Sequence, residues 1–172
     1  MAIRVGLLLA LMAGLCVTCL RADPPTPQPP DPKLSPDAPK DQPVNAGNSK
    51  EVEEVEKAIA PYIEKARKTY PDAKKRYLAG LPQGQNFFVV TKLKDKRGKF
   101  EQVFITVARI EGDKITGRIA SPIGVVQGSK QGDAYTFPEA ELVDWLITRP
   151  DGSEEGNVVG KFLDEWQSKH KK

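Results

Sequence analysis

Residues 87–120 read FFVVTKLKDKRGKFEQVFITVARIEGDKITGRIA, and this stretch decides the fold class. It contains three runs rich in β-branched and aromatic residues, separated by two short polar segments. The extended runs are residues 87–93, 100–110 and 114–120, and the polar segments are residues 94–98 and 111–113. Consecutive extended runs joined by short polar turns predict an antiparallel meander.

The chain downstream of the meander continues with a loop, further extended runs and a helix. Residues 121–132 contain Pro122 and three glycines, which predicts a long loop with little regular structure. The elements predicted after it are strands over 133–137 and 141–149, a turn at 150–152, and a closing helix over 158–169 with Asn157 as a possible cap.

Apolar residues at helical spacing precede the sheet. They recur at steps of three, four and seven: Val52, Val55, Ile59, Ile63, Ala66 and Tyr70. Because Pro61 lacks an amide proton, we expect it to kink this helix or split it in two. A second short helix is predicted from Pro71 to the stop signal at Gly80, with Tyr77 and Leu78 facing the core. The sum is an α+β fold: N-terminal helices, a curved antiparallel sheet of about five strands, and a C-terminal helix.

The first 22 residues have the features of a secretory signal peptide. Arg4 gives a positive start, residues 5–15 are nearly all apolar, and Ala22 offers a small residue for cleavage. The apolar run is shorter than the ~20 residues of a membrane span. We therefore expect export to the periplasm or beyond the cell, with no membrane span after cleavage. An uncleaved anchor is the alternative.

Both cysteines, Cys16 and Cys19, lie inside this predicted signal. Neither is preceded by the residues that bacterial lipoproteins place before a lipid-modified cysteine, so lipid anchoring is a minority alternative. Cleavage after Ala22 leaves a mature protein without cysteine. That form has no disulfide, no thiol nucleophile and no thiolate metal site.

Residues 23–49 predict a spacer, because they hold nine of the fifteen prolines and almost no large apolar residue. The remaining chain, residues 50–172, is expected to be one α+β domain. It carries a net charge of +3 spread over 41 charged residues. Nucleic-acid binding normally requires a strongly basic face, so this balance argues against a nucleic-acid partner.

Several segments together resemble a known bacterial family. The most distinctive are GDAYTF at 132–137 and LVDW at 142–145; upstream stand ARKTYP at 66–71, FVVTK at 88–92 and EQVFI at 101–105. In order and spacing they resemble domain of unknown function 2314, also called YegJ-like, over roughly residues 55–166. Members often carry a tryptophan where this chain has Phe104. The family has no settled activity, so the resemblance implies an architecture and no chemistry.

Four residues of these signature segments are the candidate binding residues: Gly132, Asp133, Asp144 and Trp145. Asp144 and Trp145 are neighbours in a predicted strand, so their side chains should point to opposite faces of the sheet. One interpretation is a groove with an acid or a stacking indole. The other is a buried Trp145 in the core, an Asp144 that accepts local hydrogen bonds, and a Gly132-Asp133 turn.

The remaining patterns give no catalytic, metal or cofactor assignment. Glu139, Glu141 and Asp144 form an acidic cluster, but paired carboxylates must converge across a cleft to hydrolyse a glycoside. His170 is the single histidine and lies near the end of the chain. We therefore predict no catalytic residues, no metal site and no cofactor.

The favoured hypothesis is a non-catalytic binding or structural module at the cell envelope. Its ligand surface is expected on the sheet face and the 121–132 loop, and the partner would be a protein, a peptide or an envelope polymer. The alternatives are an envelope hydrolase that uses acidic residues and an immunity or inhibitor protein. The sequence leaves the oligomeric state open.

Overall fold

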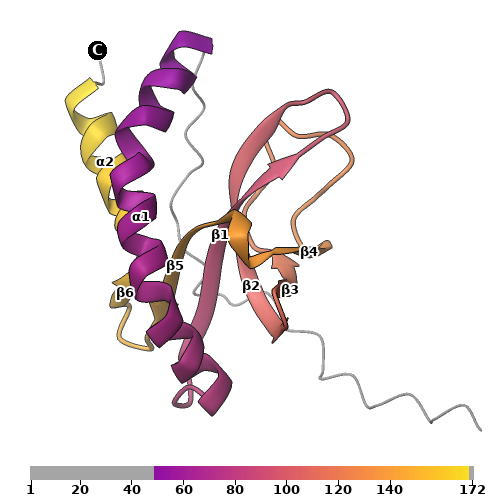
Figure 1. Ribbon diagram of the computed structural model, residues 1–172, viewed down its shortest axis with the longest axis vertical. Helices are drawn as coiled ribbons and strands as arrows, with labels where there is room; N and C mark the ends of the chain where they lie inside the picture. The colour runs from indigo at the N-terminus through magenta and orange to yellow at the C-terminus, as the bar shows by residue number, and fades with distance from the viewer. Residues whose placement is uncertain (1–48, 171–172) are drawn as a thin grey trace, which may run out of the picture.

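One curved antiparallel sheet and two helices make up the computed structural model, which describes residues 49–170 (Figure 1). The predicted signal peptide and nearly all of the proline-rich spacer lie outside the described residues. The elements, in chain order, are α1 (Ser49–Ala79), β1 (Asn86–Lys94), β2 (Phe100–Glu111), β3 (Lys114–Ile119), β4 (Ala134–Pro138), the 3-10 turn η1 (Glu139–Glu141), β5 (Leu142–Thr148), β6 (Glu154–Gly156) and α2 (Val158–His170). This arrangement confirms the predicted α+β class.

The sheet has the strand order β4-β3-β2-β1-β5-β6, and all neighbouring strands are antiparallel. The predicted meander is confirmed as β1, β2 and β3. β1 lies in the middle of the sheet, where Val89 is opposite Ile105 on β2 and Trp145 on β5. β6 was not predicted, because three residues are too few to show a periodic pattern. The 121–132 loop contains no helix or strand, as predicted.

Helix α1 is one continuous helix of 31 residues, so the predicted break into two helices is wrong. Pro61 and Pro71 both lie inside it and are both exposed. A proline has no N–H to donate within a helix. Because both prolines face solvent, water can bind the carbonyls that lack this hydrogen bond. The buried side of the helix is meanwhile held by packing against the sheet.

The predicted inner face of α1 is largely confirmed. Ile59, Ala66 and Tyr70 are buried. Gly80 ends the helix as predicted: its φ is +93° and its N–H donates to the carbonyl of Tyr77 at 3.0 Å. Leu78, which was expected in the core, is 58% exposed, because the helix continues without the predicted change of direction.

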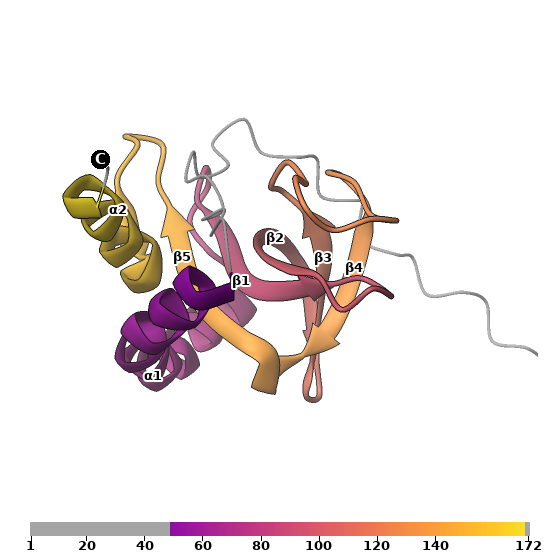
Figure 2. The same ribbon diagram turned by 90° about the horizontal axis from the view of Figure 1, so that it is seen from above.

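The two faces of the sheet carry separate apolar clusters. The Trp145 face is centred on Trp145, Phe87, Val89, Val103 and Ile105, and the Phe88 face on Phe88, Val90, Phe104 and Leu146. Helix α1 runs beside β5 and contacts both clusters, while α2 packs mainly on the Phe88 face and reaches the Trp145 cluster through Val158 at its start (Figures 1 and 2). Within residues 49–170, no helix has the length and apolar character that crossing a membrane requires.

Candidate functional site

Asp144 lies in the middle of β5 with its side chain buried against the start of α2. Its carboxylate accepts a hydrogen bond of 2.6 Å from the N–H of Val159 and one of 2.8 Å from its own neighbour Trp145. Burial raises its pKa to about 6, against the lowering effect of these N–H donors. Asn157 directly precedes α2 and its carbonyl accepts the N–H of Lys161, but the capping role predicted for its side chain is filled by Asp144 on β5. Asp144 thus satisfies a first-turn N–H that a helix cannot pair internally.

Trp145 points to the opposite face of β5 and is 5% exposed. Its indole N–H donates to the carbonyl of Ala66 at 3.1 Å and to the hydroxyl of Thr69 at 3.0 Å, both on α1. Gly156 on β6 lies directly against it: a Cβ there would come within 2.3 Å of the Trp145 carbonyl oxygen. The indole therefore joins α1, β5 and β6 in the core.

Gly132 and Asp133 form the turn that enters β4. Gly132 has a φ of +91°, and its N–H donates to the carbonyl of Ile119 at 2.8 Å. The Asp133 carboxylate accepts the N–H of Lys130 at 2.9 Å, which closes the turn on itself.

The four predicted binding residues do not form one site. Gly132 and Asp133 border β4, whereas Asp144 and Trp145 lie on β5. The strands β3, β2 and β1 stand between β4 and β5 in the sheet. Even Asp144 and Trp145 are directed to different faces. The assignment of these four residues to binding stays a prediction.

The acidic cluster of the sequence is also dispersed. Glu139, in η1, accepts a hydrogen bond from the hydroxyl of Tyr70 at 2.7 Å and forms an ion pair with the ammonium group of Lys74 at 2.6 Å. Asp144 faces α2 on the Phe88 face. Glu141 is exposed. Among residues 49–170 no group of three or more His, Cys, Asp or Glu side chains converges as metal ligands would.

A pocket opens where α1 ends and β1 begins, at the end of β1 that is opposite to the β1–β2 hairpin. The ladder between β1 and β2 stops at the pair Phe88–Thr106, and the ladder between β2 and β3 has an irregularity between Val107 and Arg109. The two strands separate there, and the hydroxyl of Tyr77 reaches in to donate to the freed carbonyl of Val107 at 3.3 Å.

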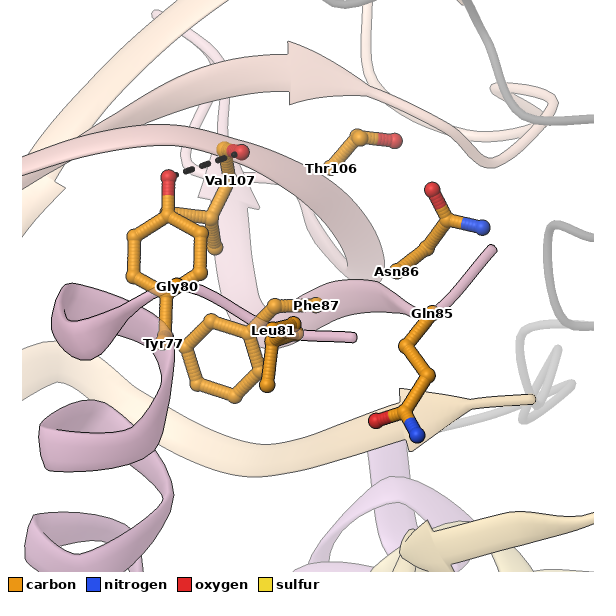
Figure 3. Close-up of a pocket in the computed structure, with 8 residues that line it drawn as sticks. All are labelled: Tyr77, Gly80, Leu81, Gln85, Asn86, Phe87, Thr106 and Val107. Carbon is orange, nitrogen blue, oxygen red and sulfur yellow. Dashed lines mark hydrogen bonds between the residues drawn. The ribbon is translucent and has the colours of Figure 1, made fainter. Parts of the chain in front are cut away.

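This α1–β1–β2 pocket has a volume of about 490 Å³. It is lined by Tyr77, Gly80, Leu81, Gln85, Asn86, Phe87, Thr106 and Val107 (Figure 3). The rings of Tyr77 and Phe87 have centroids 5.0 Å apart and form an aromatic wall. The side chains of Asn86 and Thr106 extend together away from those rings, with Gln85 beside them (Figure 3).

Thr106 lines the pocket from the Phe88 face of the sheet, as Asn86 does, whereas the rings of Tyr77 and Phe87 belong to the Trp145 face. Thr106 is 6% exposed, and within the described part of the chain its Oγ1 has no hydrogen-bond partner. The hydroxyl of Thr148 lies on the same sheet face, opposite Asn86. It is also buried and also has no hydrogen-bond partner among the described residues. Because a buried hydroxyl without a partner costs about 1–3 kcal/mol, these two groups are available to hydrogen-bond a water molecule or a ligand.

The pocket is chemically neutral. Its one titratable group is Tyr77, and burial raises the pKa of that phenol further above neutrality. Gln85, Asn86 and Thr106 supply amide and hydroxyl groups that both donate and accept hydrogen bonds. The arrangement suits a ligand with an apolar surface and uncharged polar groups.

Sequence reasoning did not find this pocket. It placed the ligand surface on the sheet face and the 121–132 loop, whereas Gln85 and Asn86 stand at the opposite end of β1. The available signal was a pair of carboxamides directly before an apolar strand. Nothing in the spacing shows that the pairing of β1 with β2 ends at Thr106, because the point where two strands part is a tertiary feature.

The fold and the pocket together define a small α+β domain with a neutral, partly aromatic site at the end of its central strands. The chain belongs to the family described as uncharacterized protein conserved in bacteria (DUF2314), whose sequence profile matches residues 54–172. This match confirms the family resemblance; it does not bear on the name YegJ-like. A comparison with curated proteins and a comparison with solved structures each found no match.

Proposed function

We propose that this domain is a non-catalytic binding module, exported to the cell envelope on a proline-rich stalk, with the α1–β1–β2 pocket as its ligand site. The observation that carries the proposal is the buried Thr106 hydroxyl, which has no partner within residues 49–170, at a pocket lined from the other face by the rings of Tyr77 and Phe87. Export rests on the features of residues 1–22 and on the composition of residues 23–49.

The placement of the acids supports a binding role over an acid-catalysed one. Asp144 and Asp133 accept hydrogen bonds from backbone N–H groups, and Glu139 is bound by a phenol and an ammonium group. None of them lines the pocket. A hydrolase that uses paired carboxylates needs them on either side of one cleft.

The ligand class follows from the pocket's chemistry. An aromatic wall offers a flat apolar contact, and the carboxamides of Gln85 and Asn86 can pair with amide or hydroxyl groups of a ligand. Peptide segments and N-acetylated glycans of the envelope both carry such groups without net charge. We therefore propose a neutral peptide or an envelope polymer as the partner.

The test is a titration of the isotope-labelled full chain with two neutral probes, an alanine tripeptide amide and a trimer of N-acetylglucosamine, followed by NMR. Saturable shifts at Asn86, Phe87 and Thr106 support the proposal. An Asn86→Ala variant should lose them, while a Gln83→Ala variant, altered in the segment between α1 and β1 but outside the pocket lining, should keep them.

The alternatives predict different results. An envelope hydrolase would release product from cell-wall material and lose this activity in a folded Glu139→Gln variant. An immunity or inhibitor protein would retain one tight protein partner and ignore both small probes. Cell fractionation and N-terminal sequencing of the mature protein test export: a start at Asp23 supports it, and an intact Met1 in the cytoplasm contradicts it.

A further inference from the structure

The hairpin between β1 and β2 carries a concentrated positive charge. Residues 92–99 hold five basic residues and one acid, a net charge of +4. Residues 50–172 as a whole hold 22 basic and 19 acidic residues, a net charge of +3. The rest of the domain therefore has a net charge of −1, although residues 65–76 of α1 form a second basic segment with six basic residues and one acid.

The acids at the tip are turned inward. The Asp95 carboxylate is 2% exposed and accepts N–H groups from Arg97, Lys99 and Gln127. These donors and the Arg97 guanidinium lower its pKa to about 2 despite an opposing effect of desolvation. Glu101, 7% exposed, accepts the N–H groups of Gly124, Val125 and Val126 from the 121–132 loop.

The cations, in contrast, point to solvent. Lys94, Lys96, Arg97 and Lys99 are all exposed. Arg97 also donates to the carbonyl of Val125, so the 121–132 loop lies beside the hairpin tip (Figures 1 and 2). The buried carboxylates hold the two segments together while the outer surface stays cationic.

Two apolar side chains accompany these cations. Phe100 is 36% exposed and Val125 is 38% exposed, and they belong to the three exposed large apolar residues found in the described chain. Lys92 lies over the Phe100 ring, 5.1 Å from its centroid, and also pairs with Glu56 of α1. Basic residues next to an exposed aromatic are the combination that binds the interface of an anionic membrane.

We propose that the tip of the β1–β2 hairpin, with Phe100 and Val125, docks the domain on an anionic phospholipid surface. Cationic side chains attract the lipid headgroups, and the two apolar side chains enter the interface. The α1–β1–β2 pocket lies at the other end of β1, which spans roughly 25 Å. A domain bound by its tip therefore presents the pocket away from the membrane.

The experiment is co-sedimentation of the full chain with phosphatidylcholine vesicles, with and without phosphatidylglycerol. The tip variant combines Lys94→Glu with Lys96→Glu. The matched control combines Lys65→Glu with Lys75→Glu, two exposed lysines on α1. All proteins share residues 1–48, so any contribution of the apolar N-terminal run is equal in each.

The wild-type chain and the α1 control should bind anionic vesicles more tightly than neutral ones. The tip variant should lose about tenfold or more of its affinity for the anionic vesicles, and raising the salt from ~0.1 M to ~1 M should weaken wild-type binding. A Phe100→Ser variant should bind less tightly at both salt concentrations. Circular dichroism should show all variants folded.

Three results would overturn the proposal. One is equal binding to neutral and anionic vesicles. Another is an equal loss in the tip variant and the α1 control. The third is binding to a soluble polyanion that depends on Lys94 and Lys96 while anionic vesicles are not bound, which would point to a soluble acidic partner. None of these results depends on the pocket, so failure of the membrane proposal can be distinguished from failure of the proposed ligand binding.

Discussion

The Oδ2 atom of Asp144 on β5 accepts a hydrogen bond of 2.6 Å from the backbone N–H of Val159 on α2. A strand residue thus binds the first turn of a helix that follows it by fifteen positions. On the opposite face of the same strand, Trp145 binds the carbonyl of Ala66 on α1. The Asp-Trp pair therefore attaches both helices to the sheet.

The Asp144 contact predicts a pH dependence of stability. Its pKa rises from 3.8 to about 6, mainly through burial. Between these values the native state holds a proton that the unfolded chain has released, so the free energy of unfolding falls as pH rises. This contribution is fully present below pH ~4 and is lost as the pH rises through about 6. It amounts to about 3 kcal/mol.

Denaturant unfolding of the wild type and an Asp144→Asn variant from pH ~4.5 to ~7.5 measures this effect. The variant keeps the shape of the side chain and cannot titrate. Asp95, Asp151 and Glu155 have lowered pKa values, and their contributions are the same in both proteins. The wild-type stability should decline relative to the variant; parallel curves would show that the burial of Asp144 does not set its pKa.

The Trp145 indole should contribute to stability. We expect Trp145→Phe to lower the free energy of unfolding by about 2 kcal/mol, because it loses the bond to Ala66 and leaves space against Gly156. Trp166→Phe, at a half-buried position on α2, should cost less than about 1 kcal/mol. A Trp145→Phe variant with wild-type stability and no ligand binding would instead assign the indole to a binding site.

Glu101 should order the 121–132 loop. Its carboxylate accepts three consecutive backbone N–H groups, and Gln at this position would direct an amide N–H toward some of them. Hydrogen exchange at residues 124–126 should become about tenfold faster or more in Glu101→Gln. Glu111→Gln, at an exposed position, should leave exchange in the loop unchanged.

Glu155 on β6 should stabilise the end of α1 modestly. It accepts two hydrogen bonds from Arg76 at 2.6 and 3.0 Å and one from Arg149 at 2.7 Å. Because all three groups are partly exposed, Glu155→Gln should cost only about 0.5–1 kcal/mol, and less at high salt. Thermal unfolding at low and high salt measures this, with Glu165→Gln as the control for an exposed pair. A larger loss that salt does not reduce would contradict a surface network.

The sequence predicts the features of this fold that depend on local pattern. Alternation in 100–110 and the turns at 94–98 and 111–113 correctly predict β2 and its neighbours. The continuity of α1 through Pro61 was not predictable, because it depends on packing of the inner face against strands far along the chain.

The candidate site was harder to predict for the same reason. Asp144 and Trp145 were recognised as distinctive, but their partners Val159 and Ala66 lie in two different helices. The pocket depends on where β1 and β2 separate, and the basic tip depends on where Asp95 and Glu101 point. Each of these is a long-range property that residue spacing alone does not contain.

The central claim is that the α1–β1–β2 pocket binds a neutral ligand, and Thr106 tests it most directly. Thr106→Val removes the hydroxyl and keeps the shape, and Thr106→Ser restores a hydroxyl. The measurement is the dissociation constant of whichever neutral probe binds, with the melting temperature recorded for each variant. The account predicts that Val weakens binding about tenfold without lowering the melting temperature, since it removes an unsatisfied group, and that Ser restores much of the affinity. Equal affinity in the wild type and Thr106→Val, or the absence of any saturable binding, would contradict it.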